Sequence, residues 1–313
     1  MLEFLQFREA AKIERVVLGT SSGLPNSKLG KCAHPADDMA SMADLMEYLF
    51  APLPSGDGGS SNNSALAQLR ATDGHKAPFA SDGLVIEIGN ECHCDPSYFP
   101  SFNETISAMA SRVRATAPAV GRLSFASMAG VIMMRDCNAA ENSAMAEIVR
   151  FWASRNVQVL SDQHIPAEVG PSGFSQVFQT LANMSAMVAD MLGPANNSSG
   201  FAFFVGEENC ASDKNVPNSP LCHGLGRALL HALNGNGLHR HGSNTCLGVA
   251  SATLYGASGR QFEWPQAGIE FTNREVLLQP PFWAKKMVGD RCVLYCGVLF
   301  MHVYAVLHCL LCC

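Results

Sequence analysis

Short apolar runs alternate with longer amphipathic segments along most of this 313-residue chain. The short runs have the length of β-strands, whereas the longer segments repeat their apolar residues at helical spacing. A strand followed by a helix, repeated several times, is typical of a parallel sheet, because each parallel strand is reached through a crossover. The alternation therefore predicts an α/β fold. The predicted strands are residues 15–20, 84–89, 123–128, 157–162, 202–206 and 247–252, and the predicted helices are 37–50, 102–115, 142–154, 174–192, 221–233 and 282–288.

The number and order of these segments favour a (β/α)8 TIM barrel that lacks its first two βα units. Six strand–helix pairs are found where a complete barrel has eight, and a helical segment precedes the first strand. The Gly- and Ser-rich stretch 52–64 is predicted to be a loop within one domain, since the same alternation continues on both sides of it. We therefore expect residues 1–288 to form one partial barrel domain.

The charge of the chain argues against a nucleic-acid partner. Its net charge is −6 and 15% of its residues are charged, so no basic face is expected. His231, His239 and His241 are close in sequence, but they lack a convincing set of further ligands. No metal ion is predicted.

Residues 289–313 form a separate apolar, Cys-rich tail. Between residues 292 and 313 there is no Asp, Glu, Lys or Arg, and this length matches a helix that spans a bilayer. Two interpretations are open: a membrane anchor, or a non-native end produced by a frame-shifted or mis-spliced gene model. A membrane partner is expected only in the first case.

The compartment is predicted to be extracellular or the secretory pathway. Acceptor sequences for N-glycosylation suit a secreted glycoprotein, although the amino-terminal segment mixes charges with apolar residues and shows no signal-peptide order. The twelve cysteines are dispersed and do not fix the redox compartment. The acceptor sequences begin at Asn62, Asn103, Asn183, Asn196 and Asn197.

Two carboxylates follow apolar strands and indicate the chemistry. The run Leu84-Val-Ile-Glu-Ile-Gly-Asn-Glu91 ends in Glu91, and the run Phe201-Ala-Phe-Phe-Val-Gly is followed by Glu207 and Glu208. Barrel enzymes keep their catalytic residues at the carboxyl ends of strands. A pair of carboxylates in such positions favours glycoside hydrolysis, and a retaining enzyme needs them about 5–5.5 Å apart. The spacing alone leaves Glu207 and Glu208 as alternatives.

These motifs resemble the α-L-arabinofuranosidases of glycoside hydrolase family 51 over roughly residues 2–288. The most specific segment is Glu87-Ile-Gly-Asn-Glu91, and Phe204-Val-Gly-Glu207 is similar to the second catalytic strand of the family. Further similarity lies in Leu2-Glu-Phe-Leu-Gln, in the segment from Leu69 to Phe79, and from Trp264 to Trp283.

The resemblance implies a role for each candidate residue. Glu91 corresponds to the general acid/base and Glu207, rather than Glu208, to the nucleophile. Asn90 is expected to bind a sugar hydroxyl or else to shape its turn, and His164 to face the substrate or else to be a structural histidine. Glu87 has the same strand parity as Glu91, so we expect it to support the substrate site from the same face.

The implied activity is removal of terminal non-reducing α-L-arabinofuranosyl residues, with retention, from arabinose-containing polysaccharides or glycoproteins. No cofactor is implied. Two alternatives stay open: another retaining glycosidase of the same clan, and an inactive fragment or pseudoenzyme that binds carbohydrate.

Overall fold

The computed structural model describes part of the chain in detail and divides it into two compact units, which are described separately. Unit 1 comprises residues 1–162 and 191–201, and unit 2 comprises residues 163–190 and 202–313. The described residues are 2–13, 15–20, 34–54, 64–89, 92, 97–127, 139–167, 203–210, 225–226, 228–233, 246–249, 254–256, 269–271, 276–278 and 280–289.

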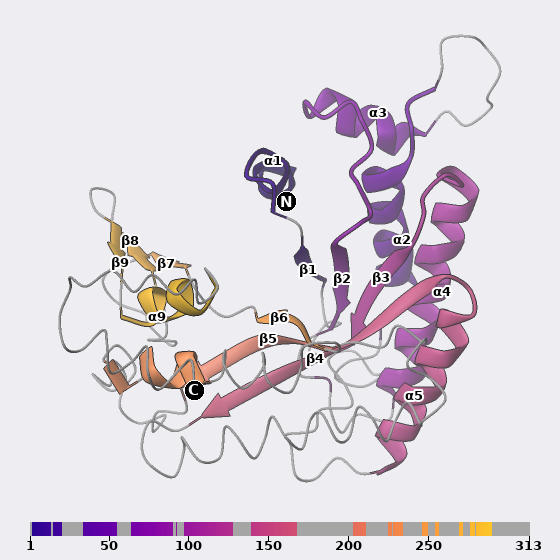
Figure 1. Ribbon diagram of the computed structural model, residues 1–313. Helices are drawn as coiled ribbons and strands as arrows, with labels where there is room; N and C mark the ends of the chain where they lie inside the picture. Colours follow the sequence, from indigo (N-terminus) through magenta and orange to yellow (C-terminus); the bar gives the residue numbers. More distant parts are fainter. Residues whose placement is uncertain are drawn as a thin grey trace. The chain divides into compact units, whose positions relative to one another are not determined.

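Unit 1 contains a parallel sheet with the strand order β1-β2-β3-β4 (Figure 1). The strands are β1 (Val16–Thr20), β2 (Leu84–Ile88), β3 (Leu123–Ser127) and the first part of β4 (Val157–Ala167). All four were expected from the apolar runs, and the parallel α/β arrangement is confirmed. Closure into a barrel and the lack of two βα units remain predictions.

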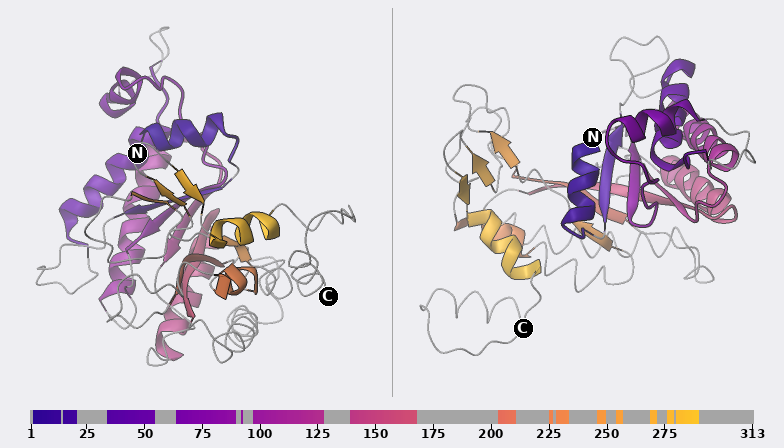
Figure 2. Two further views of the ribbon diagram at one scale, coloured as in Figure 1. Left: turned by 90° about the vertical axis from the view of Figure 1, so that its left-hand side faces the viewer. Right: turned by 90° about the horizontal axis from the view of Figure 1, so that it is seen from above.

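Five helices belong to the described part of unit 1. They are α1 (Leu2–Ala10), α2 (Ala36–Phe50), α3 (Ala65–Thr72), α4 (Tyr98–Thr116) and α5 (Ala139–Ala153). Within this unit, α2, α4 and α5 cover one side of the sheet, and α1 lies next to β1 at the edge of the sheet (Figure 2). Helix α4 begins four residues earlier than predicted, because Pro100 is accommodated in the first turn, where no intrahelical N–H is needed.

Helix α3 is not among the helices predicted from the sequence. Its amino terminus is capped by Ser64, whose Oγ accepts a hydrogen bond of 2.9 Å from the Ala67 N–H. The cap satisfies one of the free N–H groups of the first turn. A Ser ahead of a short Ala- and Leu-rich segment was therefore the signal that could have revealed this helix.

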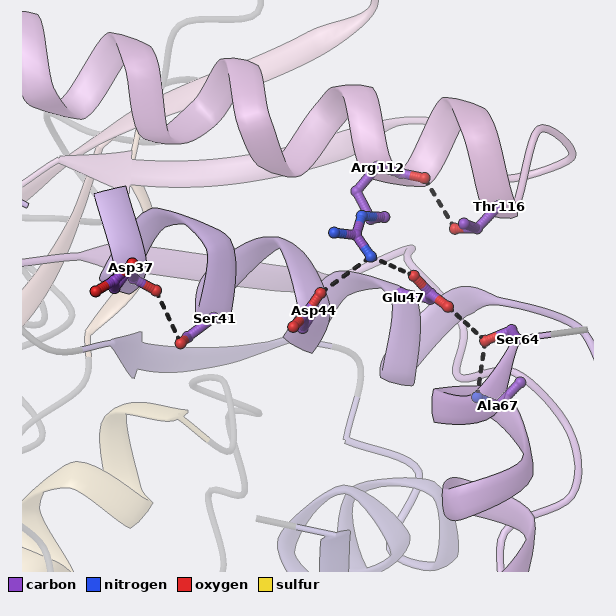
Figure 3. Close-up of polar contacts among 8 residues, drawn as sticks. All are labelled: Asp37, Ser41, Asp44, Glu47, Ser64, Ala67, Arg112 and Thr116. Atoms are coloured by element: carbon purple, nitrogen blue, oxygen red, sulfur yellow. Dashed lines mark hydrogen bonds and ion pairs between the residues drawn. The ribbon is translucent and has the colours of Figure 1, made fainter. Parts of the chain in front are cut away.

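A polar network joins α2, α3 and α4 (Figure 3). Arg112 Nη1 lies 2.6 Å from Glu47 Oε2 and 3.0 Å from Asp44 Oδ1, while Ser64 Oγ donates to Glu47 Oε1 at 2.7 Å. Burial of Glu47 would by itself raise its pKa. Hydrogen bonds from Arg112 and Ser64, together with the Arg112 charge, outweigh burial and lower the pKa of Glu47.

A buried arginine fixes the chain around α3. Arg70 is 0% exposed, and its guanidinium donates to the carbonyl oxygens of Tyr48 at 2.6 Å and Ala51 at 2.8 Å. Longer bonds reach the carbonyls of His75 at 3.1 Å and Lys76 at 3.3 Å. Desolvation lowers the pKa of Arg70. This one side chain ties the end of α2 to the segment that leads toward β2.

Unit 2 contains two groups of strands in its described part. β5 (Phe203–Cys210) pairs in parallel with β6 (Cys246–Val249), and a separate three-stranded sheet has the order β7-β8-β9. The members of this sheet are β7 (Leu254–Gly256), β8 (Ile269–Phe271) and β9 (Val276–Leu278). Helix α9 (Pro280–Gly289) follows, and its Ala284 packs against Ala228 and Ala232.

Several sequence expectations fall where the structure describes nothing. They concern the tail after Gly289, the predicted helix 174–192 and most of the acceptor asparagines, all of which lie outside the described residues. Within the described ranges, no helix combines the length and the apolar character needed to cross a membrane.

Candidate active site

The two faces of the unit 1 sheet differ in chemistry. Ile86 and Ile88 of β2 are 1% and 0% exposed, and Ile86 lies in an apolar row with Leu18 of β1 and Phe125 of β3. Because side chains alternate along a strand, Glu87 points to the opposite face. We assign the apolar rows to the side that α2, α4 and α5 cover. The opposite face carries Val17 and Gly19 of β1, Val85 and Glu87 of β2, Ser124 and Ala126 of β3, and Gln158, Leu160 and Asp162 of β4.

Glu87 is half-buried and has small neighbours in register on both sides. Gly19 lies opposite it on β1 and Ala126 lies opposite it on β3. A Cβ placed on Gly19 would lie 3.7 Å from Glu87 Oε2, so the carboxylate extends over the space that the glycine leaves. The Thr20 hydroxyl also donates to the Glu87 carbonyl oxygen at 2.7 Å. The sheet thus presents a carboxylate near the carboxyl end of β2.

The neighbouring strands add polar side chains to this face. Ser124 Oγ donates to Gln158 Oε1 at 3.2 Å, which links β3 to β4. Asp162 is 1% exposed and lies on β4, one residue beyond the last residue that pairs with β3. A buried carboxylate is costly unless it has a partner, and Asp162 does interact with other groups. This face therefore combines carboxylate, amide and hydroxyl side chains with apolar ones.

The end of β2 has an unusual backbone. Gly89 has a φ of 87°, in the left-handed region, and a Cβ at this position would lie 2.7 Å from Cys92 Sγ and 3.3 Å from the Tyr98 ring. Only glycine fits both requirements. Cys92 is 1% exposed and forms a disulfide, and the Tyr98 hydroxyl donates to the Ile88 carbonyl at 2.7 Å. Sequence reasoning missed Cys92 and Tyr98.

The predicted acid/base and its neighbour follow directly from this backbone. Asn90 and Glu91 occupy the two positions between Gly89 and Cys92 in the sequence, and both lie outside the described residues. The structure therefore defines the strand that leads into them and the cysteine that follows them.

Glu207 and His164 were expected just after their strands, and here the sequence interpretation was wrong about the strand ends. β5 continues to Cys210 and β4 continues to Ala167, so both residues lie inside strands. The apolar run marks only the part of a strand that is strongly buried, whereas the backbone ladder tolerates polar residues further along. The described structure gives the backbone of these two residues and not their side chains.

The described part of the chain contains no candidate metal site. No three His, Cys, Asp or Glu side chains come together there as a metal site would require. His231, one of the three clustered histidines, lies in the helical residues 228–233 and is 4% exposed.

The chain resembles solved glycosidase structures in its fold. An α-L-arabinofuranosidase from Thermotoga maritima, solved with arabinose, matches with a TM-score of 0.55 and 13% identity over 92% of this chain and 52% of that one. A family 51 α-L-arabinofuranosidase from Bifidobacterium longum matches with a TM-score of 0.59 and 13% identity over 93% and 56%. A glucosidase from Croceicoccus marinus matches with a TM-score of 0.51 and 10% identity over 92% and 52%.

These similarities, to glycosidases that are TIM-barrel enzymes, support a glycosidase fold and do not single out family 51. The chain spans about half the length of the structures it matches. No family model matches the sequence, and no curated protein is significantly similar to it.

Proposed function

We propose that this protein is a retaining glycoside hydrolase that removes terminal α-L-arabinofuranosyl residues from arabinose-containing polysaccharides or glycoproteins. The observation that carries the proposal is the end of β2: a buried parallel strand leads through a left-handed Gly89 into Asn90 and Glu91, in a fold similar to that of arabinofuranosidases. Strand ends of this kind are where barrel enzymes place their catalytic groups.

In this proposal Glu91 is the general acid/base and Glu207 the nucleophile. Glu207 attacks the anomeric carbon and forms a glycosyl–enzyme ester, while Glu91 donates its proton to the leaving oxygen. Glu91 then removes a proton from water, which attacks the anomeric carbon and releases Glu207 as carboxylate. The step consumes one water for each glycosidic bond broken and needs no metal or cofactor.

The remaining candidate residues are proposed to bind and orient the sugar. Asn90 is adjacent to the acid/base and can hydrogen-bond a hydroxyl beside the cleaved bond, and His164 is proposed to contact the substrate from β4. Glu87 is proposed to support the substrate site, because its carboxylate lies beside Gly19 near the carboxyl end of β2.

A secretory or extracellular location is also proposed. The Cys92 disulfide supports it, because disulfides persist in oxidising compartments. A membrane partner is proposed only if the tail beyond residue 291 is a genuine anchor.

The direct test is release of 4-nitrophenol from 4-nitrophenyl α-L-arabinofuranoside, beside Glu91→Ala and Glu207→Ala variants. Activity in the unaltered chain is expected, together with a loss of at least about 1,000-fold in kcat/KM for Glu207→Ala. Glu91→Ala should instead lose mainly kcat, which includes the base-assisted deglycosylation step, because 4-nitrophenol departs readily without an acid. Azide should restore turnover of the Glu91 variant as a glycosyl azide. Glu208→Ala is the matched control for Glu207, and it should retain activity.

A second candidate is another retaining glycosidase of the same kind, which the similarity to a glucosidase favours. Parallel assays with 4-nitrophenyl glucoside and xyloside separate the two. A folded chain that binds arabino-oligosaccharides but hydrolyses none of these substrates would instead identify a carbohydrate-binding pseudoenzyme.

A further inference from the structure

The segment that carries the proposed acid/base is fixed at both of its ends. It starts from Ile88, the last residue of β2, and reaches the buried Cys92 after Gly89 and only two further residues. The contacts that hold Ile88, Gly89 and Cys92 therefore lie within three residues of Glu91 in the sequence.

The first fixed point depends on Tyr98. Its side chain is 0% exposed, and its ring lies 5.4 Å from the Phe102 ring and 5.6 Å from the Phe99 ring. This packing holds the phenol in the first turn of α4, from which its hydroxyl donates to the Ile88 carbonyl. Tyr98 thus ties the end of β2 to the start of the following helix.

The second fixed point is Cys92. Its sulfur occupies the space that a Cβ on Gly89 would need, so Cys92 and Gly89 lie against each other. Its disulfide removes further freedom, because a cross-linked cysteine cannot leave its buried position without its partner.

We propose that Tyr98 and Cys92 are positioning residues for the general acid/base Glu91, an inference that rests on the proposed function. A general acid must lie within about 2.6–3.2 Å of the oxygen that it protonates. Displacement by about 1 Å can cost about 100-fold in rate. Neither residue contacts substrate in this proposal, and both act by restricting the segment that contains Glu91.

Displacement of Glu91 should slow the enzyme on one kind of substrate more than on another, whereas a general loss of stability should affect both equally. A displaced acid slows cleavage of a substrate whose leaving group needs protonation, and it spares a substrate whose leaving group departs readily without it. Phenyl α-L-arabinofuranoside is of the first kind and the 4-nitrophenyl glycoside is closer to the second. The two substrates share the same sugar, so sugar binding is matched between them.

The experiment compares kcat/KM of Tyr98→Phe and Cys92→Ala on both substrates and across pH. Tyr98→Phe removes one hydroxyl and keeps the ring in its packing. We expect kcat/KM for the phenyl glycoside to fall about 10- to 100-fold and that for the 4-nitrophenyl glycoside to fall less than about 3-fold. The basic limb of the pH profile, which reports the acid, should move as well.

Tyr48→Phe is the matched control, because it also deletes a tyrosine hydroxyl in unit 1, one that donates to Asp73 at 2.9 Å. It should leave both substrates and the pH profile unchanged. Equal losses on the two substrates with an unmoved pH profile would overturn the inference while leaving the glycosidase intact. If the unaltered, folded chain hydrolyses neither substrate, the proposed function fails and this inference fails with it.

Discussion

Replacing Arg70 is expected to loosen the end of α2 and the whole of α3. The guanidinium is fully buried, and its two shortest hydrogen bonds, at 2.6 and 2.8 Å, satisfy the carbonyls of Tyr48 and Ala51. Hydrogen bonds to charged groups contribute about 1.5–3 kcal/mol each, so these two alone represent about 3–6 kcal/mol. The two longer bonds add less, and the effects are not additive because all four share one side chain.

Arg70→Ala should therefore destabilise unit 1 by about 3–5 kcal/mol, similar to the cost of breaking a buried ion pair. Ala and Arg have nearly the same helix propensity, so the loss is not due to α3 itself. Arg70→Lys keeps the charge but presents its donors from a single nitrogen, and a loss of about 1–3 kcal/mol is expected.

Amide hydrogen exchange of peptides covering residues 36–50 and 65–72 measures this effect locally. Under conditions where exchange reports the opening equilibrium, 3–5 kcal/mol corresponds to an acceleration of roughly 100- to 4,000-fold. Arg114→Ala, which removes an exposed arginine from α4, should change exchange by less than about 3-fold. A loss below about 1 kcal/mol in Arg70→Ala would refute the assignment of Arg70 as the anchor of this region.

Three further outcomes follow from the polar groups of unit 1. The pKa of Glu47 is lowered in the folded state, so its carboxylate stabilises the fold at pH values above its ordinary pKa, and this stabilisation is lost on acidification. In urea titrations at different pH values, Glu47→Gln should reduce the fall in unfolding free energy that occurs below about pH 4.5. Burial lowers the pKa of His34, although the charge of Asp38 opposes this. As the pH falls, His34 therefore becomes protonated in the unfolded chain at a higher pH than in the folded protein, and the free energy of unfolding decreases below about pH 6.5. His34→Leu should abolish this pH dependence of stability. It should not destabilise the protein at pH 8, because neither ring nitrogen has a hydrogen-bond partner among the described contacts. An unchanged pH dependence in the variant would contradict the assignment to His34. The Asn103 amide accepts from the Trp152 indole at 2.8 Å and the sequon's Thr105 is 0% exposed, so mass spectrometry of the folded, secreted protein should find Asn103 unglycosylated.

The strands and helices of unit 1 were largely predictable from local pattern. The apolar runs at 84–89 and 123–128 became β2 and β3 almost residue for residue, and the helical spacing at 37–50 became α2. Such patterns are local, because the period of a helix or strand is set by backbone geometry over a few residues. The one helix that was missed, α3, is short and depends on its Ser64 cap and on Arg70.

The candidate site was predictable only in part, for a related reason. The sequence identified β2 as the strand leading to Glu91, and the structure places Glu87 on the sheet face opposite the apolar rows, as its parity required. The true ends of β4 and β5 were not predictable, because polar residues such as Glu207 continue a strand whose ladder involves the backbone alone.

By itself, the sequence determined the four strands of unit 1 and most of its helices, the parallel α/β class and the two strands that lead to candidate carboxylates, whereas it did not predict α3 or the strands β7, β8 and β9. The tertiary structure decided which groups hold that framework in place: the Tyr98 hydroxyl on the Ile88 carbonyl, the Cys92 sulfur against Gly89, and Arg70 on carbonyls up to 22 residues away. Periodicity reports which face of an element is apolar. It carries no information about which polar group meets which carbonyl, because that depends on how separate elements pack together.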